Sequence, residues 1–205
     1  MDPMHQTPLA HLLDAIAAKT PAPGGGAVAS ITGTLAAALA QMVLSYSIGR
    51  KSLAEHDAEL RQAASRLERA RHLLLQLAEE DAAAYEQFNA LQQAVKTNPE
   101  LARKLPAAAA RAIAVPRAVL ATAADLSRLL LELPARTNKH LASDLAIAAI
   151  LCDATARAAA WNVRINLPTL PDAADRDAVT RECAALLAEI ADRVHDIERA
   201  CGASA

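Results

Sequence analysis

Residues 27–48 contain no charged side chain, although the stretch is long enough for about six turns of helix. A helix that is apolar on every side must be buried inside a protein or in a membrane. Several polar residues interrupt the stretch, and we find no second segment of this kind, so we expect a central buried helix. Ala29, Gly33 and Ala37 recur at a spacing of four, which allows a partner helix or a second subunit to pack closely on this ridge.

The composition indicates a core built from small and aliphatic residues. Hydrophobic residues make up 53% of the 205 residues, but aromatic residues only 2%. Ala, Leu, Ile and Val must therefore fill the core, which suits helices pressed close together. We expect an all-α fold, an up-and-down bundle of about six to eight helices formed by a single domain over residues 1–205.

Apolar residues at helical spacing predict where these helices lie. Pro106 and Pro116 should start or kink helices, and residues 162–171 read as an irregular segment. The predicted helical segments are 9–20, 27–48, 54–95, 101–133, 142–161 and 177–201.

Charge and cysteine usage exclude several classes of function. The 21 basic and 23 acidic residues give a net charge of −2, so no overall field attracts nucleic acid. Three scattered cysteines predict neither a disulfide framework nor a zinc site. The N-terminal residues lack the pattern of a signal peptide, so we expect a protein of the reducing cytoplasm.

Three of the six glycines stand together in Pro21-Ala22-Pro23-Gly24-Gly25-Gly26, directly before the uncharged helix. Glycine lets backbone N–H groups approach a ligand, and the following helix offers more unpaired N–H donors. Neither a P-loop nor a dinucleotide fingerprint fits, because the lysine and the preceding strand are missing. The segment predicts a ligand cradle; the alternative is a turn that merely starts a helix.

Three charged side chains beside apolar segments have both a functional and a structural explanation. Asp144 follows Ser143, which predicts either a capped first helical turn or a catalytic carboxylate. Lys51 can complement a helix C-terminus or meet a substrate carboxylate, and it can also be an ordinary solvated lysine. Asp81 lies among acidic neighbours, which is typical of an exposed helix face.

Asparagines form the remaining candidates. Asn138 lies in the polar run 137–144. Asn162 and Asn166 would share one face if the helix continued past residue 161, where they could bind a polar ring. Alternatively, they end the helix through bonds from side chain to backbone. The six histidines are scattered, so no metal site is predicted.

These residues fall into three ordered blocks that resemble the cyclodeaminase/cyclohydrolase family, which includes the C-terminal domain of formiminotransferase-cyclodeaminase. The first block is residues 21–26 with the small-residue helix that leads to Ile48-Gly49-Arg50-Lys51. The second is residues 80–85, and the third is residues 138–144 followed by 162–167. Three blocks in matching order over nearly the whole chain are far more specific than one glycine motif.

The resemblance implies an all-helical homodimer, a folate substrate, no cofactor beyond the tetrahydrofolate substrate itself, and no metal. It also implies the roles of three charged residues in the reaction. Asp144 would orient or deprotonate water, Lys51 would bind the negative end of the folate or polarise the developing hydroxyl, and Asp81 would be a second acid or base. The implied substrate-binding residues are Pro23, Gly24, Gly25, Gly26, Asn138, Asn162 and Asn166.

The implied activity is hydrolysis of methenyltetrahydrofolate to 10-formyltetrahydrofolate in one-carbon metabolism. Two alternatives remain at this point: formiminotetrahydrofolate cyclodeaminase, which releases ammonia, and a catalytically silent folate-binding helical dimer. In each case we expect a small-molecule ligand, with neither nucleic acid nor a membrane as partner.

Overall fold

The helical periodicity of the sequence appears as six α-helices in the computed structural model, which describes residues 4–203. No strand occurs in this part of the chain, so the predicted all-α fold is confirmed. Short 3-10 turns precede α3, α4 and α5. The helices are α1 (Leu9–Ala17), α2 (Gly25–Ser45), α3 (Asp57–Thr97), α4 (Leu105–Leu131), α5 (Ala142–Asn166) and α6 (Ala173–Gly202).

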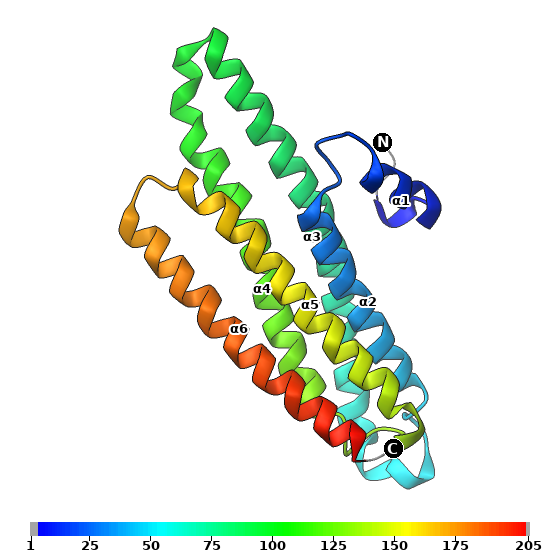
Figure 1. Cartoon of the computed structure of the whole chain (residues 1–205). Coiled ribbons are helices and arrows are strands. Elements are labelled where there is room, and N and C mark those ends of the chain that lie inside the picture. Colours follow the sequence, from blue (N-terminus) through cyan, green and yellow to red (C-terminus); the bar gives the residue numbers. More distant parts are fainter. Residues whose placement is uncertain (1–3, 204–205) are drawn as a thin grey trace.

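Helices α2 to α6 lie side by side as an elongated bundle, and α1 lies beside it near the start of α2 (Figure 1). Helix α2 packs against α3 and α5, and α4 packs against α3, α5 and α6. One continuous cluster of buried aliphatic side chains joins them, with Leu44, Leu74 and Leu145 among its fully covered members. The burial of this apolar surface is the main force that holds the bundle together.

The small-residue ridge of α2 is covered by helices of the same chain. Ala29, Gly33 and Ala37 are all buried. A Cβ atom at Gly33 would lie 2.9 Å from Cγ2 of Thr155 and 3.1 Å from Cδ1 of Leu74, so α3 and α5 both touch the backbone there. The predicted close packing is confirmed, and the partners are α3 and α5.

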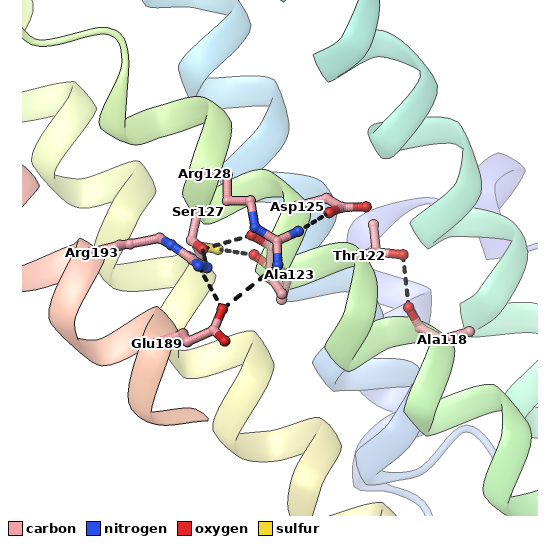
Figure 2. Close-up of polar contacts among 10 residues, drawn as sticks. Ala118, Thr122, Ala123, Asp125, Ser127, Arg128, Glu189 and Arg193 are labelled. Carbon is pink, nitrogen blue, oxygen red and sulfur yellow. Dashed lines mark hydrogen bonds and ion pairs between the residues drawn. The ribbon is translucent and has the colours of Figure 1, made fainter. Parts of the chain in front are cut away.

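A polar network fastens α6 to α4 (Figure 2). Arg193 of α6 donates to the buried hydroxyl of Ser127 at 3.2 Å and pairs with Glu189 at 2.6 Å. Glu189 also lies 3.6 Å from Arg128 of α4. Because each Arg pairs with the same carboxylate, the network fixes one register between the two helices.

Most helix ends differ from the sequence prediction by two to five residues; α1, for example, ends at Ala17 and not at residue 20, and α6 begins at Ala173 and not at residue 177. Residues 162–166 continue α5, so the irregular segment predicted there was wrong up to Asn166. The amides of Asn162 and Asn166 donate to carbonyls four residues earlier, which supports the last turn. Pro116 lies inside α4, buried by its neighbours, whereas Pro106 starts that helix as expected. Ser143 lies inside the first turn of α5 and is not its cap.

Two segments are long and apolar enough to cross a membrane by length and composition alone. They are Gly25–Ser45 and Pro99–Leu131, so the expectation that α2 stands alone in this respect was wrong. About half of each, 50% and 56% of the apolar window, is buried inside the bundle. Core helices of proteins without membrane spans also meet these criteria.

The tight contact at Gly33 gives a test of the fold. Gly33→Ala should lower the free energy of unfolding by about 1–3 kcal/mol, because the added methyl group forces α2 away from Thr155 and Leu74. Urea denaturation followed by circular dichroism measures the change. Gly202→Ala is the matched control, since nothing lies within 4 Å of a Cβ there. Equal stability of the two variants would contradict the packing described.

Candidate functional site

A pocket of about 310 Å³ lies at the first turn of α2, where the glycine-rich loop meets three other helices. The loop forms the rim of the pocket, and α3 contributes the carboxylate of Asp81. Helix α4 contributes Ala112, and α5 contributes the side-chain amides of Asn162 and Asn166. The lining residues are Pro21, Ala22, Gly24, Gly25, Gly26, Asp81, Ala82, Ala84, Tyr85, Ala112, Asn162, Ile165 and Asn166. The structure therefore brings the predicted loop together with Asp81, Asn162 and Asn166, while Pro23 lies within the loop but outside this lining.

Asp81 is the charged group of this pocket. It is half-buried, and its carboxylate accepts a hydrogen bond from the backbone N–H of Ala27 in the first turn of α2. Burial raises the pKa of Asp81 above the ordinary value of 3.8, and the Ala27 hydrogen bond opposes that shift. Asp81 is thus not on an exposed acidic face, and a carboxyl with a raised pKa beside a cavity can exchange protons with a ligand.

Position 26 requires glycine because the Asp81 carboxylate occupies the space that a side chain would need there. A Cβ atom at Gly26 would overlap the Asp81 carboxylate. At Gly25 a Cβ would only touch the side-chain oxygen of Asn162 at 3.5 Å, and at Gly24 it would touch the carbonyl oxygen of Pro21 at 3.8 Å. The missing side chain at Gly26 is therefore what lets the carboxylate lie against the helix N-terminus.

The side-chain amides of Asn162 and Asn166 line the pocket. Asn162 Nδ2 donates to the carbonyl of Ala158 at 3.0 Å. Asn166 Nδ2 donates to the carbonyls of Asn162 at 2.9 Å and Ala112 at 3.3 Å. Asn166 Nδ2 thus has an acceptor for each of its two N–H groups and Asn162 Nδ2 for one of them, while no hydrogen bond from the described residues engages either Oδ1, so both oxygens can accept from N–H donors of a ligand.

The other three predicted residues lie at the opposite end of α2. Lys51 begins the 3-10 turn Lys51–His56 and is exposed, and Asp144 is half-buried in the first turn of α5. The side-chain oxygen Oδ1 of Asn138 accepts from the backbone N–H of His140 and so caps the turn Lys139–Leu141. Asp144 and Asn162 are 18 residues apart on one helix, a rise of about 27 Å.

Of these three residues, Asn138 lines a basic hollow of about 310 Å³, whereas Lys51 and Asp144 lie outside its lining. Ser47, at the end of α2, accepts from the backbone N–H of Asn138 at 2.9 Å and so fixes the two loops together. No carboxylate lines the hollow in the described part of the chain. Its lining residues are Arg50, Ser52, Leu53, Ala135, Thr137, Asn138, Lys139 and His140.

Several residues that line the pocket were not among the predicted site residues, and three of them, Tyr85, Ile165 and Ala112, add chemistry to it. Tyr85 and Ile165 are 46% and 74% exposed, so the pocket has an apolar mouth on α3 and α5. Ala112 contributes a carbonyl oxygen from α4. The spacing of Tyr85 four residues after Asp81 would have indicated a shared helix face, but no sequence pattern connects either residue with α4.

The described residues contain no group of three or more His, Cys, Asp or Glu side chains placed to hold a metal ion. The three cysteines are buried and form no disulfide.

The raised pKa of Asp81 predicts how stability depends on pH. Asp81→Asn should stabilise the fold at neutral pH, because only the folded wild type buries this charge. As the pH falls through the raised pKa and then below 3.8, the carboxyl becomes protonated in both states and the advantage of the variant should vanish. Urea denaturation of the wild type and of Asp81→Asn at several pH values from 7 to 3 measures the difference between their free energies of unfolding. A difference that does not change with pH would contradict the buried, charged Asp81.

Comparison with known proteins identifies relatives over almost the whole chain. Residues 8–185 match the family model described as formiminotransferase-cyclodeaminase. The chain is 33% identical to a methenyltetrahydrofolate cyclohydrolase of Methylorubrum extorquens, with 86% of this chain and 87% of that protein covered. It is also 33% identical to the formimidoyltransferase-cyclodeaminase of Sus scrofa, where 89% of this chain corresponds to 34% of that protein.

A solved structure agrees with the fold. The formiminotetrahydrofolate cyclodeaminase of Thermotoga maritima superposes with a TM-score of 0.88 at 31% identity, with 97% of this chain and 98% of that chain covered. The chain spans about a third of the length of the pig protein, so the likeness there is to one part of a longer polypeptide. The family model, the identities and the shared fold together show that this chain belongs to the formiminotransferase-cyclodeaminase family.

Proposed function

We propose that this protein hydrolyses methenyltetrahydrofolate to 10-formyltetrahydrofolate. The observation that carries the proposal is Asp81, a half-buried carboxylate in a pocket whose lining contains no basic residue. The methenyl carbon of the substrate belongs to a cationic amidine, and a carboxylate without a cationic partner stabilises such a charge. The methenyltetrahydrofolate cyclohydrolase of Methylorubrum extorquens, which is 33% identical over most of both chains, supports this choice.

The pocket suits the two steps of this reaction. In the first step, water adds to the methenyl carbon while the Asp81 carboxylate accepts one of its protons, which leaves a neutral carbinolamine. In the second step, the bond from that carbon to N5 breaks, N5 takes up a proton from Asp81, and the hydroxyl loses its proton to the solvent as the formyl C=O forms. One water is consumed and one proton is released overall.

The remaining pocket residues would hold the folate ring system. The Oδ1 atoms of Asn162 and Asn166 would accept from the N–H groups of the pterin, and the loop from Gly24 to Gly26 would lie against it without side chains in the way. Tyr85 and Ile165 would cover the aminobenzoyl group at the mouth. Asp144, Lys51 and Asn138 lie outside this pocket, so the roles that the family resemblance implies for them are additional to the two steps above, in which Asp81 takes the proton from water.

A formiminotetrahydrofolate cyclodeaminase is the second candidate. The solved relative bears this name, and a carboxyl with a raised pKa can also protonate a departing amine. Ammonia release from formiminotetrahydrofolate would identify that activity. A folate-binding dimer without catalysis would bind the methenyl compound and leave its rate of hydrolysis unchanged.

The setting of the reaction is also proposed. The chain would act as a homodimer in the cytoplasm, where free buried cysteines such as Cys152 stay reduced. It would require no metal and no cofactor beyond the tetrahydrofolate substrate, and it would bind neither nucleic acid nor membranes.

Turnover of methenyltetrahydrofolate is the direct test. The wild-type protein should accelerate the loss of the near-ultraviolet absorbance above the buffer rate, and Asp81→Asn should lower kcat about 10²- to 10⁴-fold. The wild-type rate should fall in acid with a midpoint above 3.8, because burial raises the pKa of Asp81. A wild-type protein without acceleration would refute the proposal.

The glycine-rich loop provides a second test. Gly26→Ala should lower kcat nearly as much as Asp81→Asn, because the added methyl group displaces the carboxylate. Gly24→Ala is the matched variant, since its methyl group makes only an ordinary contact, and it should cost clearly less activity. Equal losses in both variants would show that the loop acts independently of Asp81.

A further inference from the structure

The pocket at the start of α2 is too small to enclose a whole folate. Its volume of about 310 Å³ is near the lower limit of small-molecule sites, which span about 300–1,000 Å³. The pterin with the methenyl carbon fills such a space, beside Asp81 and the two asparagines. The aminobenzoyl ring and the glutamate of the folate must therefore lie outside the pocket, on the surface next to its mouth.

The pocket itself offers no group that attracts the glutamate. Asp81 is the one charged residue of its lining in the described part of the chain, and it repels a carboxylate. Lys51 begins the turn that follows α2, and α2 is 21 residues or about 30 Å long. Within one copy of the chain, the glutamate therefore needs a different cation, close to the mouth.

Helix α5 carries an exposed indole next to the mouth. Ile165 lines the pocket, and Trp161 lies one turn earlier on the same side of α5. Trp161 is 65% exposed, although an indole is among the side chains that gain most from being covered. With Tyr85 on α3, these side chains form an apolar surface that leads out of the pocket and suits an aromatic ring.

Arg164 lies at the outer end of this surface. Its Cζ atom is 4.6 Å from the centroid of the Trp161 ring, so the guanidinium stacks over the indole. It is exposed and forms no ion pair with a carboxylate of the described residues. Because stacking engages the face of the guanidinium, the N–H groups at its edge remain able to bind a carboxylate through two parallel hydrogen bonds.

We propose that Trp161 and Arg164 form a subsite for the aminobenzoylglutamate part of the folate, with the aminobenzoyl ring against the indole and a glutamate carboxylate on the guanidinium. The ligand would extend from Asp81 past Ile165 to Arg164. Its cationic carbon, aromatic ring and carboxylate would then meet a carboxylate, an apolar surface and a cation in the same order. Arg164 would thus select folates over pteroates, which lack the glutamate. The identity of the ligand rests on the function proposed above.

Binding of two ligands that differ only in the glutamate tests the subsite. 5-Formyltetrahydrofolate lacks the methenyl bridge that is hydrolysed, and 5-formyltetrahydropteroate lacks the glutamate as well. In calorimetry the wild type should bind the first about 5- to 20-fold more tightly than the second. Arg164→Gln should abolish this preference by weakening only the first ligand. Arg164→Lys should restore part of it, because an ammonium group lacks the planar, stacked fork.

Two other arginines serve as controls. Arg157 lies two turns earlier on α5, is 73% exposed and pairs with Asp153 at 3.6 Å, so Arg157→Gln should keep the preference. Arg111 is exposed and adjacent in sequence to the pocket residue Ala112. A preference lost in Arg111→Gln but kept in Arg164→Gln would overturn the proposal. Equal weakening of both ligands in Arg164→Gln would also overturn it, since that result indicates a structural role.

The emission of Trp161 shows where the ligand lies, because the chain contains no other tryptophan. Saturating 5-formyltetrahydrofolate should change this emission, after correction with free N-acetyltryptophanamide for the light that the ligand absorbs. In Arg164→Gln the half-maximal change should need about 5- to 20-fold more ligand. An emission that saturating ligand leaves unchanged would overturn the proposal, because the aminobenzoyl ring would then not contact the indole.

Turnover separates this inference from the proposed function. Arg164→Gln should raise the KM for methenyltetrahydrofolate about 5- to 20-fold and leave kcat nearly unchanged, because Arg164 contacts no reacting atom. An unchanged KM would overturn the subsite alone. A wild type that prefers 5-formyltetrahydrofolate as described but does not hydrolyse methenyltetrahydrofolate would refute the proposed function alone. A protein that binds neither ligand would refute both.

Discussion

The close approach of α2 to its neighbours is the constraint on which the structure depends. At Gly33 the backbone of α2 touches Thr155 and Leu74, and at Gly26 it touches Asp81. The first contact holds α3 and α5 against the central helix, and the second brings a carboxylate to the N-terminus of that helix. Fold and candidate site thus arise from the same feature, a helix whose side chains are small where other helices meet it.

The pocket illustrates how burial changes the chemistry of an ordinary residue. Asp81 belongs to an acidic run that an exposed helix face would explain, yet the loop and α5 cover it and raise its pKa. The hydrogen bond from Ala27 keeps the carboxylate in place without cancelling that shift. A group balanced in this way can accept a proton and return it, which is what hydrolysis of a cationic amidine requires.

The distribution of polar groups along the bundle gives the molecule two hollows of different charge, one at each end of α2. The acidic pocket and the basic hollow are separated by the length of α2, and exposed apolar side chains of this helix, such as Leu35, lie between them. The buried small-residue ridge of α2, with Ala29, Gly33 and Ala37, serves the fold.

The sequence alone determined the helical class, the central place of α2 and the glycine-rich loop, because apolar spacing and small residues act locally. It also provided the three blocks that carry the family resemblance. Only the tertiary structure decided that Asp81, Asn162 and Asn166 share the pocket while Asp144 and Lys51 do not. Such distances depend on how α2, α3 and α5 align along the bundle. That alignment is set by side-chain packing between residues far apart in the sequence, which no local pattern encodes.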